Sequence, residues 1–206
     1  MSRAELIVLS FKGLLAWSLL AALGWYFGGT LGQCLLPVFN FIINQASPDY
    51  ASWLKLVPEQ HDFSIQLSAI VLHPIRLGDQ QWLTAGQELT AGTHLMHTLV
   101  PMVIELSVLL VWPVKVWPER FVLLMLGLVT SIIVLGVTAP FILMGNLEIY
   151  LQELAEQAKV KRPEPWTLTW MIFSEMGGRW ILSIIAACLC IRLQQKVINK
   201  ITPSIL

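Results

Sequence analysis

Long apolar runs alternate with polar stretches along this chain. The runs cover about residues 7–27, 95–112, 121–144 and 166–191. An α-helix rises about 1.5 Å per residue and the hydrocarbon core of a bilayer is about 30 Å thick, so roughly 20 apolar residues suffice to cross it. The pattern therefore predicts a mainly α membrane protein, a four-transmembrane-helix bundle that forms a single membrane domain over residues 1–206.

The first run follows a short basic start, Arg3 and Lys12, which is also typical of a secretory signal peptide. The run is longer than the usual apolar part of such a peptide, and no clean cleavage site closes it. We therefore expect an uncleaved signal anchor. The glycines within residues 28–32 are expected to loosen the helix, and residues 34–43 to continue as an amphipathic segment along the membrane surface.

Residues 44–92 have the pattern of β-structure. Apolar and polar residues alternate over 63–71, which is the period of a half-buried strand. Gly78-Asp79 indicates a turn, and residues 81–89 suggest a second strand. About fifty residues bury too little surface for an independent core. We expect a small extracytoplasmic β-hairpin-like segment between the first and second helices, resting on the helices.

The connector before the last run, residues 146–165, is polar. Leu147, Tyr150, Leu151 and Leu154 recur within it at helical spacing. This periodicity predicts an amphipathic surface helix in the first half of the connector.

Composition supports the membrane assignment. Hydrophobic residues make up 56% of the chain and charged residues 13%, against roughly 45–50% and 25% in soluble domains. Net charge is zero and no basic stripe follows the sequence, so we expect no nucleic-acid partner. Several of the nine tryptophans fall at the ends of the apolar runs, as expected at headgroup depth. The first partner implied is the lipid bilayer.

The basic residues predict the orientation. With the N-terminus in the cytoplasm, the short inner connections are dense in Lys and Arg, while the basic residues outside are spread over longer segments. This distribution follows the positive-inside rule, although Lys159, Lys161 and Arg162 weaken it. We expect a multi-pass protein of the bacterial inner (plasma) membrane with both termini cytoplasmic.

Three charged residues lie within the apolar runs. Glu105 stands about halfway along the second run, and Glu175 and Arg179 stand in the fourth. An unpaired charge at the bilayer centre costs about 3 kcal/mol on insertion scales, so each needs a partner. Glu175 and Arg179 are four residues apart and would share a helix face. Counting residues along both runs gives Glu105 a similar depth, so we expect a cluster in which Arg179 bridges the two glutamates.

This cluster has three interpretations. It could be a structural clamp that holds two helices in register. It could instead form a binding site or a polar path for a substrate, or couple to protons through one glutamate. Gly177-Gly178 beside it would allow a close helix contact or a local break.

Histidines provide the other candidate chemistry. His94 and His97 would share a helix face, and with Trp82 they are candidates for extracytoplasmic contacts. No acidic or cysteine ligands lie beside them in the sequence, so we expect no metal site. No run carries a deep histidine for haem, and we expect no cofactor. Cys34 could act as a nucleophile beside a histidine, but a packing role is the simpler interpretation.

The order of elements resembles that of the small membrane proteins associated with exosortases. The matching stretches are Thr90–Thr93 at the end of the outer segment, Thr98–Pro101 entering the second run, and Gly177–Trp180 in the fourth. Exosortase systems process and sort surface proteins. The chain lacks the Cys, Arg and His set that the sorting enzymes carry on facing spans, so the resemblance implies an accessory role and not the peptidase.

These patterns lead to one functional expectation and two alternatives. We expect a non-enzymatic accessory or scaffold subunit of an inner-membrane complex for export, sorting or envelope assembly, bound to a larger membrane protein. The first alternative is a small transporter or channel subunit with a polar path lined by Glu105, Glu175 and Arg179. The second is a membrane thiol enzyme that uses Cys34.

Overall fold

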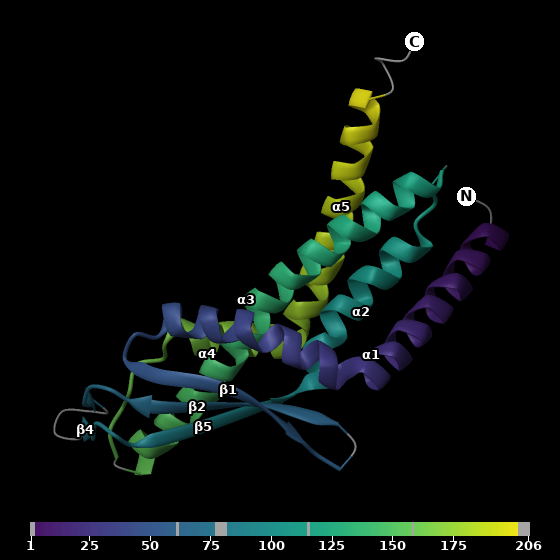
Figure 1. Cartoon of the computed structure of the whole chain (residues 1–206). Helices are drawn as coiled ribbons and strands as arrows, with labels where there is room; N and C mark the ends of the chain where they lie inside the picture. Colours follow the sequence, from purple (N-terminus) through teal and green to yellow (C-terminus); the bar gives the residue numbers. More distant parts are fainter. Residues whose placement is uncertain (1–2, 61, 77–81, 115, 158, 202–206) are drawn as a thin grey trace. The chain divides into compact units, whose positions relative to one another are not determined.

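The computed structural model describes residues 3–201 except 61, 77–81, 115 and 158, with the backbone alone for 3–6, 76, 82 and 197–201. The helices are α1 (Arg3–Ala46), α2 (Leu95–Val111), α3 (Trp117–Gln157), α4 (Trp166–Phe173) and α5 (Arg179–Ile201). The strands are β1 (Tyr50–Pro58), β2 (Phe63–Val71), β3 (Ile75–Arg76), β4 (Trp82–Leu83) and β5 (Glu88–His94) (Figure 1).

The chain divides into two compact units. The helical unit contains Met1–Tyr26, Leu99–Leu135 and Arg179–Leu206. The sheet unit contains Phe27–Thr98 and Gly136–Gly178.

Within the described residues, three helical stretches are long and apolar enough to cross a membrane. They are Ile7–Ala46, Trp117–Gln157 and Trp166–Lys196. The apolar helix α2, at 17 residues, is shorter than these. The structure agrees with the prediction of a mainly helical chain that has helices long enough to cross a membrane and a small β segment. The four predicted crossings would require the shorter helix α2 to cross as well.

The sheet unit is built on an antiparallel sheet in the order β1-β2-β5. The strand predicted over residues 63–71 is β2, and its alternation is confirmed. Ile65, Leu67, Ala69 and Val71 are buried on one face. On β5, Leu89 lies opposite Ala69 and is also buried. One face of the sheet therefore carries the apolar core of this unit.

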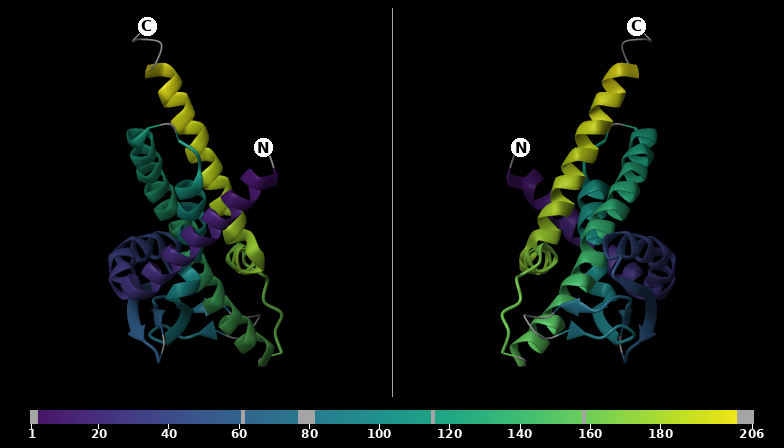
Figure 2. Two further views of the ribbon diagram at one scale, coloured as in Figure 1. Left: turned by 90° about the vertical axis from the view of Figure 1, so that its right-hand side faces the viewer. Right: turned by 90° about the vertical axis from the view of Figure 1, so that its left-hand side faces the viewer.

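The second half of α1 packs on that face of the sheet (Figure 2). A Cβ atom at Gly29 would lie 3.0 Å from the Phe63 ring, and one at Gly32 would lie 3.0 Å from Leu95 and 3.2 Å from Leu56. These glycines therefore permit a close approach of helix and strand. Helix α1 continues through these glycines to Ala46, because packing outweighs the low helix propensity of glycine. Whether they also loosen the helix stays a prediction.

The remaining strands differ from the expectation. The strand suggested over residues 81–89 is split into β4 and β5 by a turn in which Gly86 has φ +89°, a conformation that favours glycine. The turn expected at Gly78-Asp79 lies outside the described residues. The sequence pattern did not reveal β1, because most of its residues are half-buried without alternation.

The third apolar run and the first half of the connector form one helix. The predicted span 121–144 and the predicted surface helix after it are joined in α3, which ends at Gln157. Leu147 and Leu151 are buried. The Asn146 side chain donates to the Gly92 carbonyl of β5 at 3.1 Å. The periodicity of the connector therefore reflects packing in the sheet unit.

The fourth run is interrupted rather than continuous. A π-helical turn, Ser174–Gly178, separates α4 from α5, and Gly177 within it has φ +109°. Of the two uses foreseen for Gly177-Gly178, the local break is present. Such turns are frequent at functional sites.

Tyr50 makes the stability of the sheet unit depend on pH in the alkaline range. Burial raises its pKa to about 12 from 10.0, and the nearby Glu148 carboxylate adds to the rise while Arg162 opposes it. Arg162 itself donates to Glu148 at 3.0 Å. Below pH 10 the phenol is protonated in both folded and unfolded chains. Between pH 10 and 12 only the unfolded chain loses this proton, so stability falls as pH rises through that window.

We expect Tyr50→Phe to flatten the loss of stability between pH 10 and 12, by at most about 2–3 kcal/mol. Unfolding of the detergent-solubilised chain at a series of pH values would measure it. Tyr150→Phe is the matched control. Identical alkaline slopes for the wild-type and Tyr50→Phe chains would contradict the prediction.

Candidate intramembrane polar site

Helices α2, α3 and α5 pack together in the helical unit. Their shared core consists of Leu109, Leu123, Ala187, Cys190 and Ile191. Arg120, in the first turn of α3, donates to the carbonyl oxygens of Leu109 (3.1 Å) and Leu110. These are carbonyls at the end of α2 that lack helical partners. The arginine thus fixes the short connection between α2 and α3.

The interface of α2 and α3 depends on Gly127. A Cβ atom there would lie 2.2 Å from Leu109 Cδ1 and 3.4 Å from Leu106 Cδ2. Small residues at helix contacts allow backbones to approach closely in membranes. Glu105, one residue before Leu106 on α2, is thereby held against the next turn of α3.

Glu105 is the centre of a polar cluster drawn from three helices. Its side chain is 0% exposed. Ser131 donates its hydroxyl to Glu105 Oε2 at 3.0 Å, and Thr130 donates to Oε1. Cys190 Sγ lies 3.9 Å from Glu105 Oε1 and 3.1 Å from Thr130 Oγ1. We call these four residues the Glu105 site.

The Glu105 site can satisfy the carboxyl group in either protonation state. The Thr130 hydroxyl also lies 2.9 Å from the Leu126 carbonyl oxygen, and it has one proton to donate. An ionised Glu105 accepts from Thr130 and Ser131. A neutral Glu105 can donate to Thr130 Oγ1, which then donates to Leu126. Neither state leaves the carboxyl group without a partner, as a buried polar group requires.

The predicted cluster of charges is arranged differently along α5. Arg179 is the first residue of α5 and is 6% exposed. Cys190, which contacts Glu105, lies eleven residues later, about 16 Å along the helix axis. The equal depth expected for Glu105 and Arg179 is therefore not found. The residue count assumed one unbroken fourth helix with matching starting points, and the π-helical turn breaks that helix.

Glu175 lies in the π-helical turn before Arg179. Their spacing of four predicted a shared α-helical face, and that geometry does not apply across a residue with φ +109°. The pairing of Glu175 with Arg179 stays a prediction, as does any bridge from Arg179 to Glu105.

Three members of the Glu105 site were not predicted from the sequence: Thr130, Ser131 and Cys190. The signal for the first two was present as adjacent hydroxyl residues in the middle of the otherwise apolar third run. A buried carboxylate needs such donors. Cys190 gave no signal, because a cysteine in an apolar run is most simply a small hydrophobe.

The residues predicted to make extracytoplasmic contacts are partly brought together. The His94 and His97 rings lie edge to face with centroids 6.0 Å apart, and Glu59 Oε2 lies 3.6 Å from His94 Nδ1. The Trp82 side chain lies outside the described residues. Within the described ranges, no three His, Cys, Asp or Glu side chains form a group that could hold a metal ion. Cys34 is exposed on α1, and its use as a nucleophile stays a prediction.

An apolar pocket of about 420 Å³ lies between the first part of α1 and α2. Its lining includes Gly13 and Trp17 from α1 and Ser107 and Trp112 from α2. The Ser107 hydroxyl donates to the Val103 carbonyl at 2.6 Å, so it is already satisfied. The pocket therefore offers contacts for hydrocarbon rather than for a polar substrate.

In the Glu105 site, side chains from three apolar helices thus satisfy the hydrogen bonds of a buried carboxyl group. This carboxyl group belongs to one of the two glutamates identified from the sequence. Comparison of the chain with protein-family models, with curated proteins and with solved structures finds no match.

Proposed function

We propose that this chain is a non-enzymatic accessory subunit of a bacterial inner-membrane complex, in which the Glu105 site acts as a clamp between helices. The observation that carries the proposal is the complete burial of Glu105 and the supply of its hydrogen bonds by Thr130 and Ser131. A carboxylate that lines a path for a substrate would need access to water. Ionisable residues inside a membrane are functional candidates by default. A carboxyl group whose hydrogen bonds come from neighbouring helices and which has no access to water instead supports a role in helix packing.

The proposal includes α2 as a fourth membrane crossing. Its 17 residues span about 26 Å, close to the hydrocarbon thickness. Glu105 on α2 bonds to α3, which is itself long enough to cross. With the N-terminus in the cytoplasm, four crossings place the β1–β5 segment outside and both termini inside.

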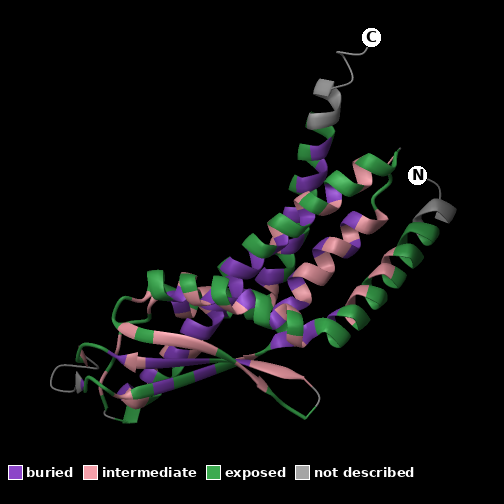
Figure 3. Cartoon of the chain, viewed as in Figure 1, coloured by how far each residue is buried: buried purple, intermediate pink, exposed green. Residues whose placement is uncertain are grey.

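The first part of α1 offers a surface for a partner. Apart from Gly24, its residues 7–26 are exposed or half-buried, and Figure 3 shows this part of the helix mostly exposed or half-buried. Ile7 and Phe11 are among its exposed residues. Lipid or the helix of another protein must cover this surface. Together with the layout resembling exosortase-associated proteins, it supports a role beside a larger membrane protein in sorting, export or envelope assembly.

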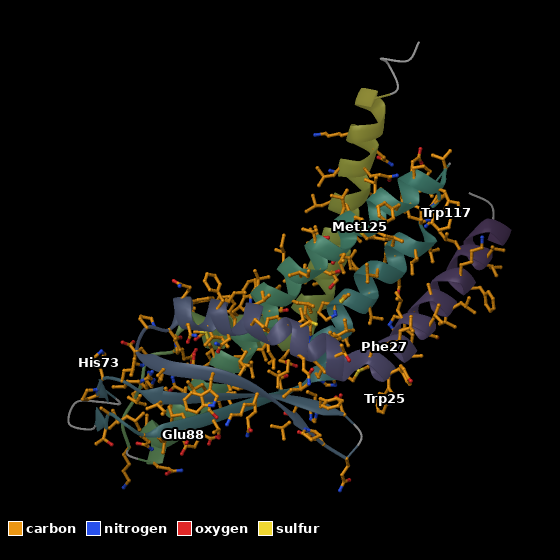
Figure 4. The ribbon with its side chains drawn as sticks, viewed as in Figure 1. Trp25, Phe27, His73, Glu88, Trp117 and Met125 are labelled. Carbon is orange, nitrogen blue, oxygen red and sulfur yellow. The ribbon has the colours of Figure 1, made fainter. Side chains whose placement is uncertain are left out.

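The orientation is tested by labelling with a membrane-impermeant maleimide. In a chain whose three native cysteines are replaced by serine, Glu88→Cys on β5 should be labelled in intact spheroplasts. Trp117→Cys, at the start of α3, should be labelled only after lysis (Figure 4 labels both positions). If Trp117→Cys were labelled in intact spheroplasts and Glu88→Cys were not, the orientation would be the opposite of the proposed one.

The accessory role is tested by purification. A tagged full-length chain, extracted from its native membranes in mild detergent, should bring down a larger membrane protein. Glu105→Gln should bring down the same protein, because the amide keeps the bonds of the Glu105 site. A preparation that contains this chain and no other protein would contradict the role. If Glu105→Gln folds but abolishes a transport activity, the transporter alternative is favoured instead.

A further inference from the structure

Strand β1 forms an edge of the sheet. In the order β1-β2-β5, all nine residues of β1 pair with β2. None of the strands in the described part of the chain lies on the other side of β1. An edge of this length presents backbone donors and acceptors that can pair with another strand.

The hydrogen-bond register identifies which groups point outward. At one end of the hairpin, the Glu59 N–H donates to the Asp62 carbonyl at 2.8 Å. At the other, the Leu72 N–H donates to the Asp49 carbonyl at 2.9 Å. Hydrogen-bonded and non-bonded pairs alternate in an antiparallel ladder, so the odd-numbered residues of β1 bond to β2. The even-numbered residues in the middle of β1, Ser52, Leu54 and Leu56, therefore direct their N–H and C=O groups away from the sheet.

The same alternation places outward groups on β5, at the opposite edge. There the Asn146 side chain donates to the Gly92 carbonyl at 3.1 Å. That edge is thus partly occupied by a side chain from α3. The β1 edge is the more open of the two in the described chain.

The side chains of β1 are complementary to those of a second copy of the same strand. Trp53 and Lys55 lie on the sheet face opposite the core, with Lys55 Nζ 5.8 Å from the Trp53 ring centroid. In an antiparallel pair centred on Leu54, each Lys55 lies opposite the Trp53 of the other copy. This adds a cation–π contact on each side of the centre. A pair centred on Lys55 would instead oppose two like charges, which is unfavourable.

We propose that β1 is a self-association edge, which pairs antiparallel with β1 of a second copy about Leu54 and joins the two sheets into one. Every outward N–H of Ser52, Leu54 and Leu56 then has an acceptor in the other copy. Pro58, which has no N–H, lies at the end of the paired segment and limits its length. The pairing is independent of the accessory role and needs no other protein.

The experiment is disulfide cross-linking of the full-length chain in native membranes, with the three native cysteines replaced by serine. Leu54→Cys should give a species of twice 23.1 kDa on mild oxidation, because directly opposed Cα atoms lie about 5.5 Å apart, within disulfide range. Trp53→Cys and Lys55→Cys should each stay monomeric alone. Co-expressed with different tags, these two variants should form a mixed disulfide, which tests the pairing without altering Leu54.

Three results would overturn the proposal. The first is a disulfide of Trp53→Cys or Lys55→Cys with itself, which requires another register. The second is the absence of every cross-link in variants that are present in the membrane at wild-type levels. The third is cross-linking of Leu54→Cys to a different protein, which would assign the edge to a heterologous partner.

Discussion

Replacing Glu105 with leucine is expected to lower the free energy of unfolding of the chain by about 1–3 kcal/mol. Leucine has a similar size but accepts no hydrogen bond, so the Ser131 hydroxyl loses its acceptor and α2 loses its polar link to α3. Thr130 is affected less, because it can still donate to the Leu126 carbonyl. Reversible unfolding in a bilayer mimic measures the change.

Two further variants show whether the hydrogen bonds are the cause. Glu105→Gln should cost less than about 1 kcal/mol, since its amide can donate to Thr130 while its oxygen accepts from Ser131. Ser183→Ala is the matched control, because the buried Ser183 hydroxyl donates to the Arg179 carbonyl in its own helix. It should change stability by less than about 0.6 kcal/mol, because this bond lies within one helix and links no second helix. A Glu105→Leu chain as stable as wild type would show that the site contributes nothing to packing.

Gly145→Ala is expected to destabilise the sheet unit by about 1–3 kcal/mol. The added Cβ would lie 2.4 Å from Met171 Cβ and 2.9 Å from its Cγ. These atoms are close to the α4 backbone and cannot move aside by a rotamer change alone. The packing of α3 against α4 must open, which also disturbs the bond from the Trp170 indole to the Val137 carbonyl (2.8 Å).

The control for this prediction is Gly13→Ala on α1. A Cβ at Gly13 meets nothing within 4 Å, and alanine is the better helix former by up to about 1 kcal/mol. The control should therefore equal or exceed the wild-type stability. Thermal unfolding of the solubilised chain compares the two variants. Equal effects of Gly145→Ala and Gly13→Ala would mean that the close contact with Met171 does not exist.

The helices could be predicted because the apolar runs have the length and composition that a bilayer crossing requires. The start of α2 at Leu95 and of α4 at Trp166 agree with the apolar runs. The continuity of α1 and α3 could not be predicted, because both continue past their apolar runs into the sheet unit. Gly32 acquires its role from Leu56 of β1 and Leu95 of α2, which pack against it, and Leu147 is buried only in the folded chain.

The candidate site was predicted in part. The mid-run position of Glu105 was enough to identify it as a residue that needs partners. Its partners could not be identified by pairing charges, because the depth of Arg179 depended on where the fourth helix begins. The break at Gly177 also interrupts the α-helical face that Glu175 and Arg179 were expected to share. Hydroxyl groups on α3 supply the hydrogen bonds that the buried Glu105 carboxyl group needs. Adjacent Thr and Ser residues within an apolar run are the sequence feature that indicates such donors.

The central claim is that Glu105 holds α2 against α3 through its bond to Ser131. A double-mutant cycle of Glu105→Leu and Ser131→Ala, measured by unfolding in bilayers, tests it directly. We expect a coupling free energy of about 0.5–1.7 kcal/mol, while Glu105→Leu and Ser183→Ala should be additive. Strict additivity of Glu105→Leu and Ser131→Ala would contradict the claim.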